Sequence, residues 1–156
     1  MKRFKKSKGD KGQSLVELLV ALALIVIIIV AVVGLSALSI KAAYFAKRQT
    51  MAKRYVEEAM EWLRAYKRDN WYNILNYRAD TNLNNIDFCL NSLNFDSPGS
   101  CSSYSLGGVF KRELMLYKYD LGVGQKPKIK ATVVVTWSDS AGNHITKVES
   151  IFSLTE

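Results

Sequence analysis

Proline, cysteine and histidine are scarce in this chain of 156 residues, which has two prolines, two cysteines and one histidine. Residues 14–68 contain no proline, and Gly34 is their only glycine. Proline and glycine are the residues that most often interrupt a helix, so this stretch can form one continuous helix. The few histidines and cysteines provide too few ligands for a zinc site. We therefore expect no metal and no cofactor.

The basic residues are unevenly distributed, although the whole chain has a net charge of +8. The first twelve residues hold six basic side chains and one acidic side chain, and an apolar run follows them. Such a leader is typical of a membrane topology signal rather than of a nucleic-acid-binding arm. Five further cations come after the run: Lys41, Lys47, Arg48, Lys53 and Arg54. Because cations flank both ends, charge alone leaves the orientation in a membrane open.

The apolar run extends from Leu18 to Ile40, and only Gly34 and two serines interrupt it. As a helix it would be about 35 Å long, enough to cross a hydrocarbon core of about 30 Å. Apolar side chains then continue at helical spacing, at Phe45, Ala52, Val56, Ala59, Leu63 and Tyr66. The pattern predicts one helix of about 50 residues, ending near Arg68, whose second half is amphipathic and needs a partner.

The remaining chain predicts a loop followed by a small sheet. Residues 69–108 are rich in Asn, Ser, Asp and Gly, and we expect at most one helical turn there. Alternating apolar residues predict strands at 110–119, 129–137 and 145–154, with a hairpin loop at 139–143. The fold class is therefore α+β, with the second half of the helix packed on an antiparallel sheet. We divide the chain into residues 1–12 (leader), 13–40 (transmembrane or filament-core helix), 41–68 (amphipathic continuation), 69–109 (loop region) and 110–156 (sheet).

Cys89 and Cys101 lie in the turn-rich loop region. Outside the cytoplasm such a pair most often forms a disulfide that closes a short loop, whereas in a cytoplasmic domain both thiols would be reduced. The sequence shows no nucleophile elbow, no phosphate-binding glycine loop and no carboxylate pair placed for acid–base catalysis. His144 follows a turn, and we expect it to face solvent. We therefore expect no enzyme.

The segment Lys11-Gly12-Gln13-Ser14-Leu15-Val16-Glu17, followed by an apolar helix, resembles the processing site of type IV prepilins and pseudopilins. In that family a membrane peptidase cuts on the cytoplasmic side after the glycine and methylates the new amino terminus. The resemblance implies cleavage after Gly12, a mature chain that starts at Gln13, and a globular part outside the cytoplasm. It also implies a pilin-like fold and assembly with other subunits through the N-terminal helix.

Glu17 would be the fifth residue of the mature chain, and a charge deep in hydrocarbon costs about 2.5–3.5 kcal/mol. In the family such a carboxylate pairs with the free amine of a first residue, so the resemblance implies that Glu17 pairs with the amine of Gln13 from its own or a neighbouring subunit. The alternative is an interfacial carboxylate that neutralises the leader lysines. A secretory signal peptide cut near Ser39 is a further alternative, although the apolar run exceeds the usual h-region of about 7–15 residues.

The resemblance implies a structural subunit, a minor pilin or pseudopilin, of a type IV pilus or of a related secretion or DNA-uptake pseudopilus. Its partners would be the prepilin peptidase, other pilin subunits and the lipid of the bacterial inner membrane. Gln13 departs from the phenylalanine that major pilins usually carry at the first mature position. Two other hypotheses remain open: a single-pass membrane protein with an extracytoplasmic binding domain, and a DNA-binding tip subunit that uses the cations between Lys41 and Arg54.

Overall fold

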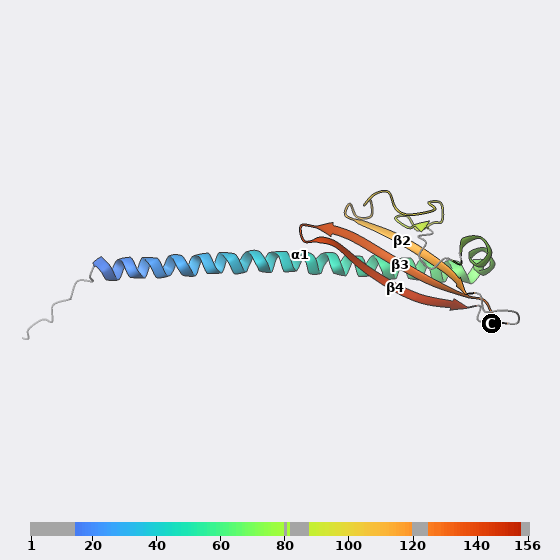
Figure 1. The fold of residues 1–156 in the computed structure, drawn as a ribbon, viewed down its shortest axis with the longest axis horizontal. Helices are drawn as coiled ribbons and strands as arrows, with labels where there is room; N and C mark the ends of the chain where they lie inside the picture. The colour runs from blue at the N-terminus through green and yellow to red at the C-terminus, as the bar shows by residue number, and fades with distance from the viewer. Residues whose placement is uncertain (1–14, 80, 82–87, 120–124, 154–156) are drawn as a thin grey trace, which may run out of the picture. The chain divides into compact units, whose positions relative to one another are not determined.

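The computed structural model describes residues 15–79, 81, 88–119 and 125–153. It contains two compact units, the first ending at Phe45 and the second beginning at Ala46, and each is described by itself. The elements are α1 (Leu15–Asn73), the π-helix η1 (Ile74–Arg78), β1 (Phe88–Cys89), β2 (Phe110–Tyr119), β3 (Lys128–Asp139) and β4 (Gly142–Ser153) (Figure 1). The α+β class is confirmed: a long N-terminal apolar helix packs on a four-stranded antiparallel sheet.

The helical segment continues past Arg68, where the sequence predicted its end. α1 reaches Asn73 with a local break at Asn70 (φ −128°, ψ 32°), and η1 follows directly. The expectation of a loop from residue 69 is therefore wrong for residues 69–78. The reason is burial: Trp71, Ile74 and Leu75 all lie in the core of the second unit, and removing these side chains from water stabilises the extra turns.

One stripe of α1 faces the core of the second unit, as the helical spacing predicted. Its fully buried members are Ala52, Val56, Ala59 and Leu63. Each large aliphatic side chain buried in this way contributes about 1.5–3 kcal/mol relative to an exposed one. Phe45 was assigned to the same stripe, but it belongs to the first unit and is 39% exposed.

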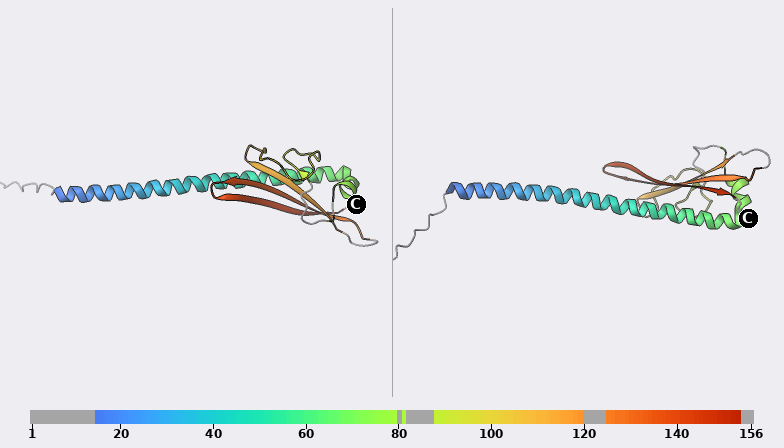
Figure 2. Two further views of the ribbon diagram at one scale, coloured as in Figure 1. Left: turned by 45° about the horizontal axis from the view of Figure 1, so that its top comes forward. Right: turned by 90° about the horizontal axis from the view of Figure 1, so that it is seen from below.

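The sheet has the strand order β1-β2-β3-β4, and all neighbouring strands are antiparallel. Val133 of β3 lies opposite Leu114 of β2 and Val148 of β4. On the helix-facing side alternate residues of β3 are buried, namely Ile129, Ala131, Val133, Val135 and Trp137. Within the second unit the sheet lies along one side of α1 (Figure 2). A sheet with one covered face produces the period-two pattern from which the strands were predicted.

Two details of the sheet differ from the predictions. The hairpin between β3 and β4 is tighter than the expected loop at 139–143, because pairing continues to Asp139 and Gly142. The backbone N–H of Ala141 donates to Asp139 Oδ1 at 2.8 Å, and Gly142 adopts a φ of 127°, which favours glycine. The other difference is β1, whose two residues pair with β2 and were too few to show a periodic pattern.

Candidate functional site: processing and assembly segment

The apolar half of α1 has no core of its own. In the first unit every large apolar side chain from Leu15 to Ile40 is 51–74% exposed. The Ser36 hydroxyl donates to the carbonyl of Val32 at 2.8 Å, so the helix itself satisfies this polar group. Among the described residues, one helix is long and apolar enough to cross a membrane, and it begins at Leu15. So large an apolar surface requires a cover of lipid or of other helices.

Glu17 lies in the first turn of α1, and its side chain is exposed. It is the only charged residue between Leu15 and Ile40. A carboxylate in this first turn is favoured by the partial positive charge of the helix N-terminus, by about 0.3–1 kcal/mol. The leader, Gly12 and Gln13 lie outside the described residues. Cleavage after Gly12 and pairing of Glu17 with the amine of Gln13 therefore remain predictions.

A comparison with protein families matches residues 7–37 to the prokaryotic N-terminal methylation motif. The chain carries a type IV prepilin-type cleavage and methylation segment. The matched range contains Gly12, Gln13 and Glu17, and it extends into the apolar half of α1. The prepilin-type segment belongs to structural, pilin-type subunits rather than to a family of enzymes. No curated protein and no solved structure matches the chain.

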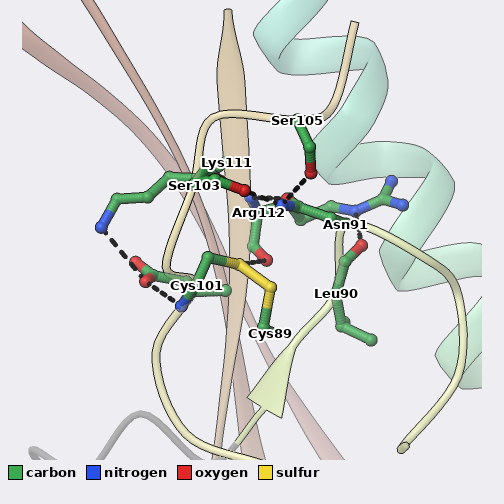
Figure 3. The surroundings of a disulfide bond; sticks show 9 residues. Cys89, Leu90, Asn91, Cys101, Ser103, Ser105, Lys111 and Arg112 are labelled. Atoms are coloured by element: carbon green, nitrogen blue, oxygen red, sulfur yellow. Dashed lines mark hydrogen bonds and ion pairs between the residues drawn. A yellow bond between two sulfur atoms is a disulfide. The ribbon is translucent and has the colours of Figure 1, made fainter. Parts of the chain in front are cut away.

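The disulfide expected from the sequence is present in the second unit. Cys89 ends β1, Cys101 lies in the following loop, and their sulfur atoms are 2.02 Å apart. The backbone N–H of Cys101 donates to Glu113 Oε1 at 3.0 Å, and Lys111 Nζ lies 3.2 Å from the same oxygen (Figure 3). The disulfide joins the loop to β1, and the hydrogen bond from Cys101 joins it to Glu113 of β2, the strand that also carries Lys111.

Asn91 provides a second connection between the same loop and β2. Its side-chain nitrogen donates to the carbonyl of Ser103 at 3.1 Å and to Ser105 Oγ at 2.8 Å. Its side-chain oxygen accepts the backbone N–H of Arg112 at 2.9 Å (Figure 3). One amide side chain thus holds both ends of the loop against the strand.

Arg112 is a structural residue that the sequence reasoning missed. Its side chain is almost fully buried, at 2% exposure. Nε donates to the carbonyl of Leu90 at 2.8 Å, and Nη1 donates to the carbonyl of Tyr55 at 2.9 Å. Nη1 also lies 2.8 Å from Glu58 Oε2. The sequence did contain an indication of this burial. Arg112 is two residues from each of the buried Phe110 and Leu114, so its side chain lies on the same face of β2.

His144 is half-buried, whereas the sequence led us to expect that it faces solvent. Its side chain is 22% exposed, its ring stacks on Trp137 at 5.2 Å, and Nε2 lies 2.9 Å from Asp139 Oδ1. The hydrogen bond with His144 is the main cause that lowers the pKa of Asp139, and the backbone N–H of Ala141 and the charge of Arg48 also lower it. Arg48 Nη1 donates to the carbonyl of Ser138 at 3.3 Å, and this hydrogen bond connects the hairpin to α1.

The described part of the chain was also compared with the metal-site expectation from the sequence. Among the described residues no group of three or more His, Cys, Asp or Glu side chains could hold a metal ion. Lys47, Lys53 and Arg54 are exposed on α1. Their role depends on what lies against this side of the helix.

Proposed function

We propose that the protein is a structural subunit, a minor pilin or pseudopilin, of a type IV pilus or of a related secretion or DNA-uptake pseudopilus. The observation that supports it is the coincidence of a prepilin-type segment with a helix whose apolar half is exposed on all sides. The peptidase cuts after Gly12, and Gln13 becomes the first residue.

The apolar half of α1 serves two environments in turn. Before assembly, residues 15–40 hold the subunit in the inner membrane, with the leader in the cytoplasm and the sheet domain outside. After assembly the same side chains lie among the helices of neighbouring subunits. Glu17 is tolerated in this setting because the amine of Gln13 neutralises it, which avoids an unpaired charge in a dry helix bundle.

The second unit is a framework for contacts between subunits rather than a catalytic domain. Its described residues show structural contacts, namely the disulfide and the buried Arg112. We expect it to determine which neighbours the subunit accepts, and we expect no enzymatic activity.

Processing can be tested by co-expressing the full chain with a prepilin peptidase. The substitution Gly12→Val should leave the chain uncut and prevent assembly, because a branched side chain at the cleaved bond obstructs the peptidase. Gly9→Val is the matched control, since it makes the same change within the leader but away from the cut. Normal processing of the Gly12→Val chain, or equal loss in both variants, would contradict the proposal.

A further inference from the structure

The side of α1 opposite its buried stripe carries a row of charged residues in the second unit. Residues seven apart in a helix lie almost one above another, and Lys47, Arg54, Glu61 and Arg68 have this spacing. All four are exposed, and four further exposed charges flank them: Lys53, Glu57, Glu58 and Arg64. We call these eight residues the outer ridge. The sheet lies along the other side of the helix, so it does not cover the outer ridge (Figure 2).

The charges of the outer ridge form three successive blocks along the helix. A basic block (Lys47, Lys53, Arg54) is followed by an acidic block (Glu57, Glu58, Glu61) and by a second basic block (Arg64, Arg68).

The fold itself uses little of this charge. Glu58 contacts Arg112, and Glu61 pairs with Arg64 one turn away. Within the described part of the chain, no carboxylate lies at ion-pair distance from Lys47, Lys53 or Arg54.

We propose that the outer ridge binds the outer ridge of a second copy of this chain, parallel to the first and displaced by seven residues along the helix. Seven residues correspond to about 10 Å. The displacement places Arg54 opposite Glu61 of the second copy, Glu57 opposite its Arg64, and Glu61 opposite its Arg68. Without this displacement, each block would face a block of the same charge on the second copy.

The contact is asymmetric, because one copy contributes Arg54, Glu57 and Glu61 where the other contributes Glu61, Arg64 and Arg68. Lys47 meets a like charge, Arg54 of the second copy, but only at the end of the contact. The inference rests on the proposed function, which places parallel copies side by side, and it adds the surface and the displacement at which they meet.

The sign pattern favours a second copy over a lipid phosphate or a nucleic acid. A phosphate-bearing partner along the outer ridge would meet the acidic block between the two basic ones, and the repulsion would oppose binding. The pattern is instead complementary to itself at one displacement. Exposed ion pairs are individually weak, so they select the displacement while the apolar half provides most of the association.

The experiment uses the full chain in a membrane that contains the prepilin peptidase, with unlabelled and nitrogen-15-labelled copies mixed. A zero-length carbodiimide reagent should join the Lys53 amine of one copy to the Glu61 carboxylate of another. Within one copy these groups are eight residues apart, about 12 Å along the helix, which is too far for such a reagent. Mass spectrometry of the mixed-isotope peptide identifies the link between copies.

Charge inversion provides the second readout, the fraction of subunits in sedimentable filaments. Glu61→Arg should lower this fraction about tenfold, because two attractive pairs per contact become repulsive. The triple variant Arg54→Glu, Glu61→Arg, Arg68→Glu should restore it to within about twofold, since every pair regains opposite signs. Glu149→Arg makes the same charge change on β4, away from the outer ridge, and serves as the matched control.

Three results would overturn the inference: filaments that tolerate Glu61→Arg, a triple variant no better than the single one, or no link between Lys53 and Glu61 of different copies. Stronger retention of lipid or DNA by Glu61→Arg, with unchanged assembly, would also overturn it and assign the ridge to a phosphate. A chain that is never cut after Gly12 would instead count against the proposed function. The intact mass separates these cases.

Discussion

The guanidinium of Arg112 on β2 lies 2.8 Å from the carboxylate of Glu58 on α1, and the two partners differ sharply in burial. The arginine side chain is 2% exposed and the glutamate side chain 53%. Because the arginine also donates to the carbonyls of Leu90 and Tyr55, it joins the helix, the strand and the disulfide-bonded loop. The glutamate holds only the outer end of this connection.

This asymmetry predicts unequal effects of substitution. Arg112→Leu should lower the free energy of unfolding by about 3–5 kcal/mol, because it leaves buried carbonyls without a donor. Glu58→Gln should cost about 1 kcal/mol or less, since solvent screens the exposed partner. Urea unfolding of the full chain in detergent micelles, followed by tryptophan fluorescence, measures both. Equal losses of unfolding free energy in the two variants would mean that the buried hydrogen bonds of Arg112 add no stability beyond its ion pair with Glu58.

Among the glycines that the structure describes, Gly107 has the least space around it. It has a φ of +56°, and a Cβ built there would lie 2.7 Å from the Tyr55 hydroxyl oxygen. Gly107→Ala should therefore destabilise the second unit by about 1–3 kcal/mol. Gly108→Ala is the matched control, because its φ is +78° but nothing lies within 4 Å. The same urea titration should show a smaller loss for the control than for Gly107→Ala.

The disulfide closes a loop between residues 12 positions apart. Removing the cross-link by Cys89→Ser with Cys101→Ser should cost about 2–4 kcal/mol, mainly because the unfolded chain gains freedom. Unfolding of the native chain with and without a reducing agent should reproduce the difference. The double variant should not respond to the reducing agent, and a response would indicate that another effect of the reagent was being measured.

The hairpin carboxylate Asp139 predicts a dependence of stability on acid. The hydrogen bond with His144 is the largest of the causes that hold its pKa below the ordinary value of 3.8. A group whose pKa is lower in the folded state contributes stability above its unfolded pKa, and this contribution disappears as the pH falls through the folded pKa. Asp139→Asn should therefore reduce the acid sensitivity of unfolding below about pH 4.

Glu149 offers a comparison for the same titration. Its pKa is also lowered, chiefly by the hydrogen bond with Lys130. Glu149→Gln should remove a separate part of the acid sensitivity, and the two parts should add because the groups do not share a partner. Carboxyl carbon chemical shifts in NMR spectra would assign each midpoint. A midpoint for Asp139 at or above its ordinary pKa would contradict this account.

The spacing of apolar residues and the composition of the chain were sufficient to predict the long helix, the three long strands and the disulfide. The stripe from Ala52 to Leu63 and the alternation from Ile129 to Trp137 both follow from one covered face. The end of the helix was mispredicted because burial of Trp71 and Ile74 outweighs the polar residues around them. β1 has only two residues, and its pairing with Leu114 and Glu113 depends on tertiary structure.

The processing segment was recognisable from sequence because its chemistry is local: a glycine, a carboxylate five residues later and an apolar run. The buried position of Arg112 was not recognised, although its strand parity indicated the core. An arginine there requires three acceptors from distant segments, which no local pattern reveals. His144 was misjudged for the same reason, since its partners Trp137 and Asp139 lie across the hairpin.

The central claim is that this chain is a processed pilin-type subunit, and the N-terminus of the protein from its native membrane tests it most directly. We predict an intact mass and an N-terminal sequence that correspond to a chain starting at Gln13, with or without one methyl group. A chain that still starts at Met1 in the presence of the processing peptidase would contradict the account. It would leave Glu17 as an interfacial charge on a plain membrane anchor.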